Sequence, residues 1–538
     1  MSVTQGSTSP PLMISVNSQG GFNADVEITL TGLPNGVVAT PASPFTVAPG
    51  SGVAILFGAG PNAAGGAYTI TADGVSGSLS NAATFSLSVQ SLVGYSAQVY
   101  AYPDLNVAPS PYKFMLYDQP RQLLYFSAPA EIDVFDLQKL IFEPDVFTLY
   151  CPSFKSLGPC PDDDVRGLAL TPDGSKLIAA DFGSQNVYLL NPGAPAIPAT
   201  AISVSSTNYN PARVAAGNTQ TVFVALSAEA TASGICTACL SEIDLSASPP
   251  ALESTPEPVV SNLVGSPLLQ GDAAGDRVFF AYATPPGGPL GLWTSPGTFT
   301  MSPANETAID LAAPSDGTLF ATVVGSSIEV HGIDSNLTSI NTFAAPPQNV
   351  PGRVSVPGIA MHPSGALVYQ PFLAGPAPPP PQAGAPLATG PQSGVDILDS
   401  HTGQLRLRVL LPEPLAATSA DVDGLHAQFI TVDENGQRIF VLTVSGLTVV
   451  QLVNVPLAIG TLTPATGPSA GGTAITIRGS GFQTGITAAI GGTSVSVTFK
   501  DMNTLTIVTP ALSPGAQQLV LANPDGETAS LDGAFTAQ

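Results

Sequence analysis

The residues with the clearest chemical potential in this sequence are four cysteines, which form two close pairs. Cys236-Thr-Ala-Cys239 has the spacing of a redox dithiol or of half a zinc site. A redox dithiol usually opens a helix beside a parallel strand, and no histidine lies near either pair in the sequence. We therefore predict structural disulfides on surface loops, with Cys151–Cys160 and Cys236–Cys239 as the preferred pairing. A cross-link between the two loops is the alternative.

A second feature is the run of three consecutive carboxylates Asp162, Asp163 and Asp164. Ca²⁺ prefers several oxygen ligands, so calcium is the one cofactor that the sequence raises. The spacing matches no EF-hand loop, and we prefer the interpretation of a solvated acidic loop with no bound cofactor.

The histidines do not predict a catalytic set. A metal site or a general base of this kind would need two or three of them to converge, and they fall in three different repeats described below. The strand-to-helix setting that a serine nucleophile or a phosphate loop requires is also missing. We predict structural or surface roles for all four, which are His331, His362, His401 and His426.

Composition excludes several classes of partner. The 538 residues exceed what a single hydrophobic core usually holds, so several domains are expected. A net charge of −24 repels phosphate backbones and anionic lipid, so we expect neither nucleic acid nor membrane surfaces as partners. No apolar stretch reaches membrane-spanning length. With 54 glycines and 53 prolines, few windows are left for long helices, and an all-β protein is predicted.

A repeated unit runs through residues 92–456, in which two strands flank a tight polar turn and a third strand carries an acidic residue. The clearest copy is Val165–Ala180, followed by Asn186–Asn191. Seven copies at spacings of roughly 40–70 residues predict a seven-bladed β-propeller, and the Pro-Asp-Gly turn resembles YVTN and NHL-like repeats. The other six turns lie in Asp118–Tyr125, Gly217–Phe223, Ala274–Phe279, Ser315–Phe320, His362–Tyr369 and Asp433–Phe440.

The two flanking segments predict β-sandwiches. Short alternating strands in residues 1–91 resemble bacterial immunoglobulin-like modules, which are mostly spacers. In residues 457–538, the stretch Leu462–Phe482 resembles the opening of an IPT/TIG immunoglobulin-like domain, and Asn523–Gly526 matches a later landmark. Because the last repeat ends before a fourth strand appears, we expect the strand near 94–102 to complete it.

The longest loops of the repeats are expected on one face, at 145–164, 229–239, 283–289 and 374–393. Loops carry function more often than scaffolds do, so any ligand should meet this face. We predict a non-enzymatic binding, adhesion or assembly protein that is secreted or at the cell surface, although no signal peptide is visible. Its partner would be a protein, a polysaccharide or a copy of itself.

One alternative is a polysaccharide or lactone lyase or hydrolase with its site at the channel mouth. The other is an intracellular scaffold.

Overall fold

The computed structural model describes most of the chain and divides it into two compact units, Met1–Ser96 and Ala97–Gln538. The prediction of an all-β protein is confirmed. Among the described residues the regular elements are strands, apart from the short 3-10 helix η1 (Ser205–Thr207), and no described helix is long and apolar enough to cross a membrane. The described residues are 2–4, 12–59, 63, 66–90, 94–102, 112–128, 131–149, 164–207, 209–227, 235–236, 240–253, 263–264, 267–283, 287–344, 353–355, 358–374, 393–416 and 428–538.

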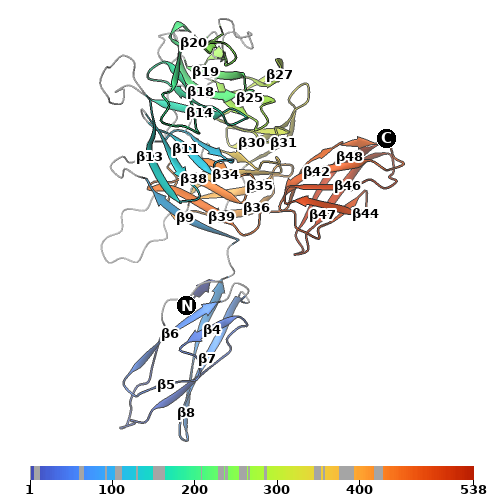
Figure 1. Ribbon diagram of the computed structural model, residues 1–538. Helices are drawn as coiled ribbons and strands as arrows, with labels where there is room; N and C mark the ends of the chain where they lie inside the picture. Colours follow the sequence, from blue (N-terminus) through green and yellow to red (C-terminus); the bar gives the residue numbers. More distant parts are fainter. Residues whose placement is uncertain are drawn as a thin grey trace. The chain divides into compact units, whose positions relative to one another are not determined.

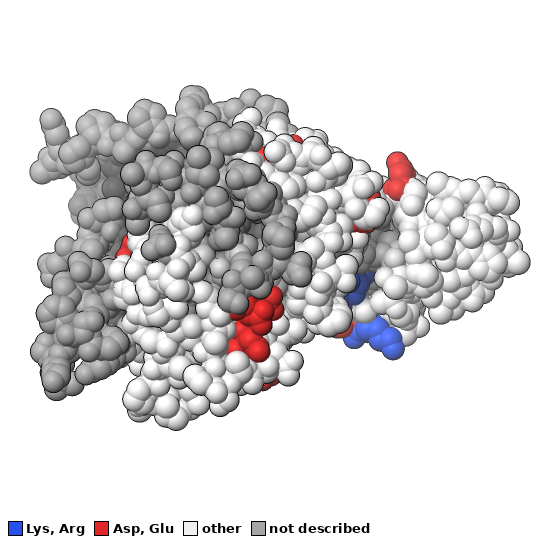
Figure 2. All heavy atoms as spheres, turned by 90° about the horizontal axis from the view of Figure 1, so that it is seen from above, with Lys and Arg blue, Asp and Glu red and all other residues white. Residues whose placement is uncertain are grey.

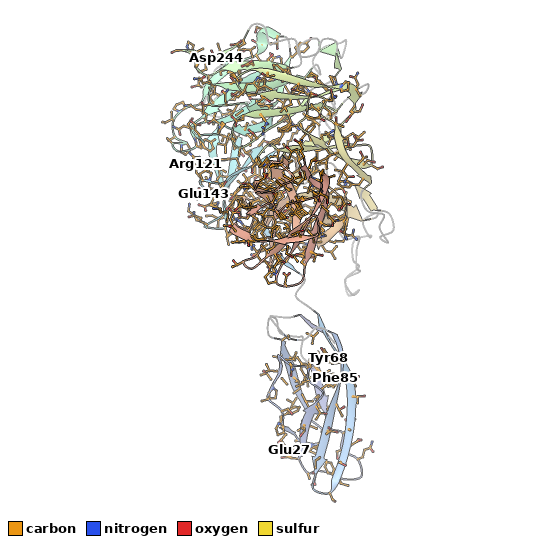
Figure 3. All side chains as sticks on the ribbon, turned by 90° about the vertical axis from the view of Figure 1, so that its right-hand side faces the viewer. Glu27, Tyr68, Phe85, Arg121, Glu143 and Asp244 are labelled. Carbon is orange, nitrogen blue, oxygen red and sulfur yellow. The ribbon has the colours of Figure 1, made fainter. Side chains whose placement is uncertain are left out.

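The first unit has two sheets that share one core. Strand β3 (Val26–Thr31) strictly alternates buried and exposed residues, as a strand with one face on a core must. Tyr68 and Phe85 pack against this core (Figure 3). One sheet has the order β1 (Ser2–Thr4), β8 (Leu79–Gln90), β7 (Gly66–Ser76), β3, β5 (Phe45–Val47), and the other β2 (Leu12–Ser15), β6 (Gly52–Ala59), β4 (Val37–Thr40).

Most of the second unit is a succession of antiparallel sheets, each built from strands that are consecutive or nearly consecutive in the chain (Figure 1). The first three sheets are β10 (Met115–Asp118), β11 (Leu123–Ala128), β12 (Glu131–Asp136), β13 (Ile141–Thr148); β14 (Val165–Leu170), β15 (Leu177–Asp181), β16 (Asn186–Leu190), β17 (Thr200–Ser203); and β18 (Asn210–Ala216), β19 (Thr221–Ser227), β21 (Leu240–Asp244), β22 (Ala251–Leu252). A short pair, β20 (Ile235–Cys236) and β23 (Leu263–Val264), lies outside these sheets.

The next four sheets repeat this pattern. They are β24 (Pro267–Gly271), β25 (Arg277–Tyr282), β26 (Gly288–Thr294), β27 (Thr298–Glu306); β28 (Asp310–Ala312), β29 (Leu319–Val324), β30 (Ser327–Gly332), β31 (Ser339–Ala344); β32 (Arg353–Ser355) and β33 (Ala360–Met361) on β34 (Leu367–Ala374), then β35 (Gly394–Asp399), β36 (Leu405–Leu410); and β37 (Ile430–Val432), β38 (Arg438–Leu442), β39 (Gly446–Leu452), β9 (Tyr95–Ala101).

Tight turns between first and second strands follow from local sequence. In Thr171-Pro-Asp-Gly-Ser-Lys176, proline fixes the backbone for a turn, and Gly174 adopts the positive φ that the turn requires. The Asp173 carboxylate accepts the Ser175 N–H at 3.0 Å, and the Thr171 N–H donates to the Lys176 carbonyl at 3.0 Å. The strands that follow are therefore held in register from the turn outward.

Central strands are buried on both faces because each sheet packs between two others. In β15 all five residues are buried. Leu177 and Ala179 pack with residues of the preceding sheet, whereas Ile178 and Ala180 pack with the following one. A strand that is apolar on both faces is what such stacking requires, in contrast to the alternation in the first unit.

The sheets close on themselves into a structure that we call the ring. First strands of neighbouring sheets contact each other, and β37 of the last sheet contacts β10 of the first. Between the fifth and sixth sheets, the Asp310 carboxylate accepts the N–H groups of Gly358 and Ile359. Strand β9, which precedes the first sheet in the chain, lies beside β39 of the last sheet (Figure 1).

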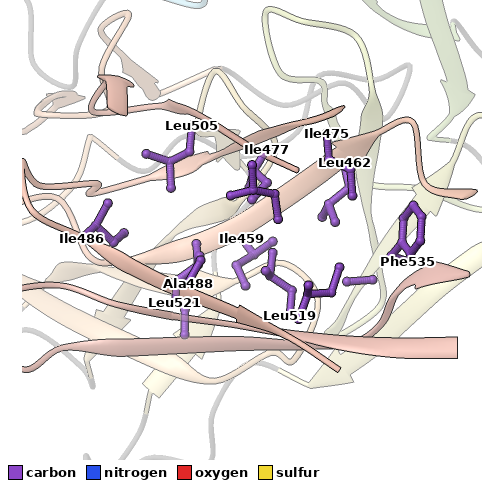
Figure 4. Close-up of a cluster of buried hydrophobic side chains, with 14 of the residues drawn as sticks. Ile459, Leu462, Ile475, Ile477, Ile486, Ala488, Leu505, Leu519, Leu521 and Phe535 are labelled. Carbon is purple, nitrogen blue, oxygen red and sulfur yellow. The ribbon is translucent and has the colours of Figure 1, made fainter. Parts of the chain in front are cut away.

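The end of the chain forms a two-sheet sandwich, which we call the C-terminal sandwich. Inward residues from both sheets, among them Ile477, Leu505, Leu519 and Phe535, form its core (Figure 4). The sheets have the orders β40 (Ala458–Thr463), β42 (Ala474–Ser480), β46 (Thr504–Val508), β45 (Val497–Asp501), and β41 (Thr466–Gly467), β48 (Thr528–Ala537), β47 (Gly515–Ala522), β43 (Thr487–Ile490), β44 (Thr493–Val495).

Candidate functional site: the channel and the two ends of the ring

A cavity of about 400 Å³ lies where the first strands of the sheets converge. All seven ring sheets contribute to its lining, which is dominated by small and aliphatic residues such as Leu168, Ala215, Ala312 and Ala360. The cavity is therefore the central channel of the ring. Polar groups lie at its two ends, and these ends differ in chemistry.

At one end, which we call the turn end, aspartates close the turns between first and second strands. Asp118 is 1% exposed and accepts Arg121 Nη1 and the Tyr125 hydroxyl, each at 2.9 Å. Asp433 accepts Arg438 Nε at 2.9 Å and the Gln437 N–H at 2.8 Å. The oxygens of these two carboxylates are thus held by donors of their own turns and of the strands that follow.

Asp272 occupies the matching position of the fourth ring sheet, with a difference. Its Oδ1 accepts the N–H groups of Asp276 and Arg277 at 2.9 and 3.2 Å. Its Oδ2 is buried and has no hydrogen-bond partner among the described residues, and burial raises the pKa of this carboxyl. Asp272 is therefore less committed to its turn than Asp118 and Asp433 are to theirs.

At the opposite end, which we call the loop end, three of the 14 lysines and arginines gather around the starts of the first strands. Arg166 Nε donates to Asp164 at 2.7 Å, and Lys113 lies 3.4 Å from the same carboxylate. Arg213 donates to the carbonyls of Arg166 and Ala212. In a chain with so few cations, three thus lie close together, and two of them, Arg166 and Arg213, are buried in the ring.

The carboxylate of Asp164 thus binds two cations in the structure. Of the other carboxylates predicted as weak metal candidates, Asp162 and Asp163 lie outside the described residues. Cys151, Cys160 and Cys239 also lie outside them, and Cys236 is described only as part of β20. The disulfide and calcium predictions, and most of the predicted long loops at 145–164, 229–239 and 374–393, therefore remain predictions.

Three of the four histidines are described, and they do not converge. His331 is on β30, His362 is in the turn before β34, and His401 is in the turn before β36. His426 lies outside the described residues. His362 is fully buried: its Nε2 donates to the Asn435 carbonyl at 2.9 Å, and its Nδ1 accepts the Ser364 N–H at 3.2 Å.

The C-terminal sandwich packs against the turn end of the ring. Arg406 Nη2 donates to the Leu457 carbonyl at 2.7 Å and lies 3.0 Å from the Glu527 carboxylate. Arg478 Nε lies 3.6 Å from the Asp316 carboxylate. Asn503 donates to the Glu434 carbonyl at 3.4 Å. The sandwich is thus attached to the fifth, sixth and seventh ring sheets, and none of these contacts involves the loop end.

We expect acid to lower the free energy of unfolding of the second unit, because burial lowers the pKa of both His331 and His362 from 6.5 to about 4. A histidine with a lowered pKa stabilises the fold above its ordinary pKa, and the contribution falls as pH drops from 6.5 to 4. For His362 the shift corresponds to about 3 kcal/mol. Asp310, whose pKa burial raises to about 6, changes stability in the opposite direction over part of this range.

Urea denaturation at pH 7.0, 5.5 and 4.5 measures this dependence. The urea midpoint should fall from pH 7.0 to 4.5 in the natural protein. It should fall less in His362→Gln, which keeps polar atoms but cannot be protonated in this range. Equal pH dependence in both proteins would contradict the assignment.

Comparison with known proteins supports the C-terminal assignment most directly. Residues 457–537 match the IPT/TIG domain family, so the prediction of an IPT/TIG domain at the C-terminus is confirmed. No curated protein matches the chain.

Solved structures with β-propeller domains are among the similar folds. The Myceliophteria thermophila Cps50 (Swd1) beta-propeller domain is 10% identical with a TM-score of 0.42, covering 64% of this chain and 98% of that one. A chain of the Mitotic Checkpoint Complex is 12% identical with a TM-score of 0.42, covering 66% of this chain and 91% of that one.

The cation cluster at the loop end was not predicted from the sequence. Lys113, Arg166 and Arg213 are far apart in the chain, one in each of three consecutive ring sheets or just before it. One signal in the sequence could have predicted the cluster. Lysines and arginines are scarce in this chain, and these three recur at the same place, just before or within the first strand of a repeat.

Proposed function

We propose that this protein is a non-enzymatic binding protein whose core is a seven-bladed β-propeller. The seven ring sheets, with β9 as the fourth strand of the last, support seven blades. The Pro-Asp-Gly turn supports a YVTN or NHL-like kind of repeat. In this proposal the first unit, with two sheets on one core, is an immunoglobulin-like spacer, and the partner is a protein.

The observation that carries the proposal is the position of the IPT/TIG domain on the ring. Two arginine–carboxylate contacts attach it to the turn end, where the turns are short. The described contacts of this domain lie at the turn end, away from the loop end, where the long loops were predicted. Such an arrangement holds one face of a propeller open toward a partner while the other face anchors an accessory domain.

The charge distribution supports a protein partner over an anionic polymer. Few lysines or arginines appear on the face shown in Figure 2, and acidic side chains gather in patches there. A polyanion would be repelled by the net charge of −24, whereas a protein partner can present basic side chains to an acidic surface. We further propose that the protein is secreted or displayed on a bacterial surface, which its lysine-poor, Thr-, Ser-, Gly- and Pro-rich composition supports.

The lining of the channel favours binding over the lyase or hydrolase alternative. The described lining is dominated by small and aliphatic side chains, and Asp118 is held by its own turn. Asp272 keeps one buried oxygen without a hydrogen-bond partner among the described residues, but no histidine stands beside it in the described lining. General acid–base chemistry would need a second acid or base aimed at the same substrate.

Site-specific photo-crosslinking tests which end of the ring binds. A photo-crosslinking residue replaces Ser206, an exposed residue of η1 at the loop end, or Ala196, an exposed residue at the turn end of the same sheet. In extracts of the source organism, we expect the Ser206 position to give a defined protein adduct at least several-fold more strongly than the Ala196 position. Equal labelling, or labelling from Ala196 alone, would contradict the proposal.

A further inference from the structure

Two neighbouring ring sheets bring together a histidine and two glutamates far from the channel. Glu306 ends β27, the last strand of the fourth sheet, while Glu329 and His331 lie on β30 of the fifth. Residues two apart on a strand point to the same face, so both β30 side chains face the same way. One ligand atom from each of the three residues lies within 4.8 Å of the other two.

The two carboxylates are not compensated by any other described group. Neither Glu306 nor Glu329 has an ion-pair or hydrogen-bond partner within the described ranges, and Glu306 Oε2 is buried. Burial and the nearby charge of Glu329 raise the pKa of Glu306. Two carboxylates this close destabilise each other unless a proton or a cation lies between them.

His331 has the tautomer that a metal-binding histidine needs, and its Nε2 lone pair is taken by a hydroxyl that a metal ion would have to displace. Its Nδ1 lies 3.2 Å from the Leu337 carbonyl, which can only accept, so Nδ1 carries the proton. The lone pair of the ring is therefore on Nε2, which accepts the Thr322 hydroxyl at 3.1 Å. Metal-ligating histidines usually donate their second ring N–H to a carbonyl or carboxylate in this way. The ring is 1% exposed and stacks on Phe320.

We propose that Glu306, Glu329 and His331 bind a divalent transition-metal ion of the Zn²⁺ type. One imidazole nitrogen with two carboxylates suits Zn²⁺ better than Ca²⁺, which takes oxygen ligands in larger number. Tetrahedral bonds of about 2.0–2.1 Å place ligand atoms roughly 3.4 Å apart, so ligand atoms that now lie within 4.8 Å of one another would close by up to about 1.4 Å. The ion would tie the outer part of the fourth sheet to the fifth.

The experiment is a titration of the chelator-treated full-length protein with Zn²⁺, followed by calorimetry. We expect the natural protein to bind about one Zn²⁺ per chain at this site. In Glu306→Gln and in Glu329→Gln, the affinity of the site for Zn²⁺ should fall at least tenfold. Glu242→Gln is the matched control, because Glu242 is a half-buried carboxylate beside Glu253 with no histidine in the group. All three variants keep the four cysteines, so binding by thiolates would not change between them.

Thermal unfolding without metal provides a second measurement. Removing one of two neighbouring negative charges should leave the metal-free protein folded and raise its unfolding temperature. Zn²⁺ should then raise the unfolding temperature of the natural protein and of Glu242→Gln, but not that of Glu306→Gln. If Zn²⁺ stabilises none of the proteins, or stabilises Glu306→Gln as much as the natural protein, the two carboxylates share a proton and the proposal is overturned.

Discussion

Replacing Gly446 with alanine is expected to release β9 from β39 and to destabilise the ring strongly. An alanine Cβ at this position would overlap the Tyr100 carbonyl oxygen, which is backbone and cannot rotate away. The clash falls where the first and last strands of the ring meet, so we expect a loss of about 3 kcal/mol or more in unfolding free energy. The same stretch is held by Tyr102, whose N–H donates to the Ser445 carbonyl at 3.1 Å.

Thermal unfolding and limited proteolysis measure this effect. Gly446→Ala should unfold at a markedly lower temperature, with early cleavage within β9. Gly297→Ala is the control, because a Cβ there meets no atom within 4 Å. If Gly446→Ala unfolds at the same temperature as the control, the pairing of β9 with β39 does not stabilise the ring.

The second large effect is expected at a buried ion pair in the sixth sheet. Arg408 Nε and Nη2 donate to the two carboxylate oxygens of Asp396 at 2.7 and 3.1 Å, and Asp396 is 0% exposed. Arg408→Met would leave this charge buried without its cation. Removing one partner of a buried pair typically costs about 3–5 kcal/mol, and we expect a loss of that size in the free energy of unfolding.

A double variant separates the destabilisation caused by an unpaired buried charge from the net contribution of the ion pair to stability. Asp396→Leu with Arg408→Met removes both charges, and most of the lost stability should return. Lys139→Met is the control, because its pairs with Asp136 and Glu143 lie at the surface and should contribute less than about 1 kcal/mol. Chemical denaturation measures the free energy of unfolding of the natural protein, of Arg408→Met, of the double variant and of Lys139→Met. A double variant no more stable than Arg408→Met would contradict this account.

The sequence predictions that the structure confirms depend on patterns of residues that are close together in the chain. Proline, aspartate and glycine in Thr171–Lys176 specify a turn within a short segment, and the segment Asn186–Asn191 of the clearest repeat contains β16 of the structure. The IPT/TIG match likewise depends on closely spaced glycines and apolar residues. Signals of this kind are readable because each involves groups that are close together in the chain.

The candidate sites depend on packing between sheets and were missed. Glu306 and Glu329 lie on strands of different sheets, and nothing in either segment of sequence tells which way its side chain faces. Which outer strand meets which neighbour is set by how the ring sheets stack. The cations Lys113, Arg166 and Arg213 are likewise brought together by ring geometry rather than by sequence spacing.

The pairing of β9 with β39 has a consequence for synthesis of the chain. Nearly the whole ring lies between these two strands in the sequence, and translating it takes on the order of tens of seconds. During that time the emerging sheets can pair internally, while β9 has no partner and the first sheet lacks its last neighbour. Ring closure is therefore one of the last folding events, and a ribosome stalled before β39 would expose an unpaired strand to neighbouring chains.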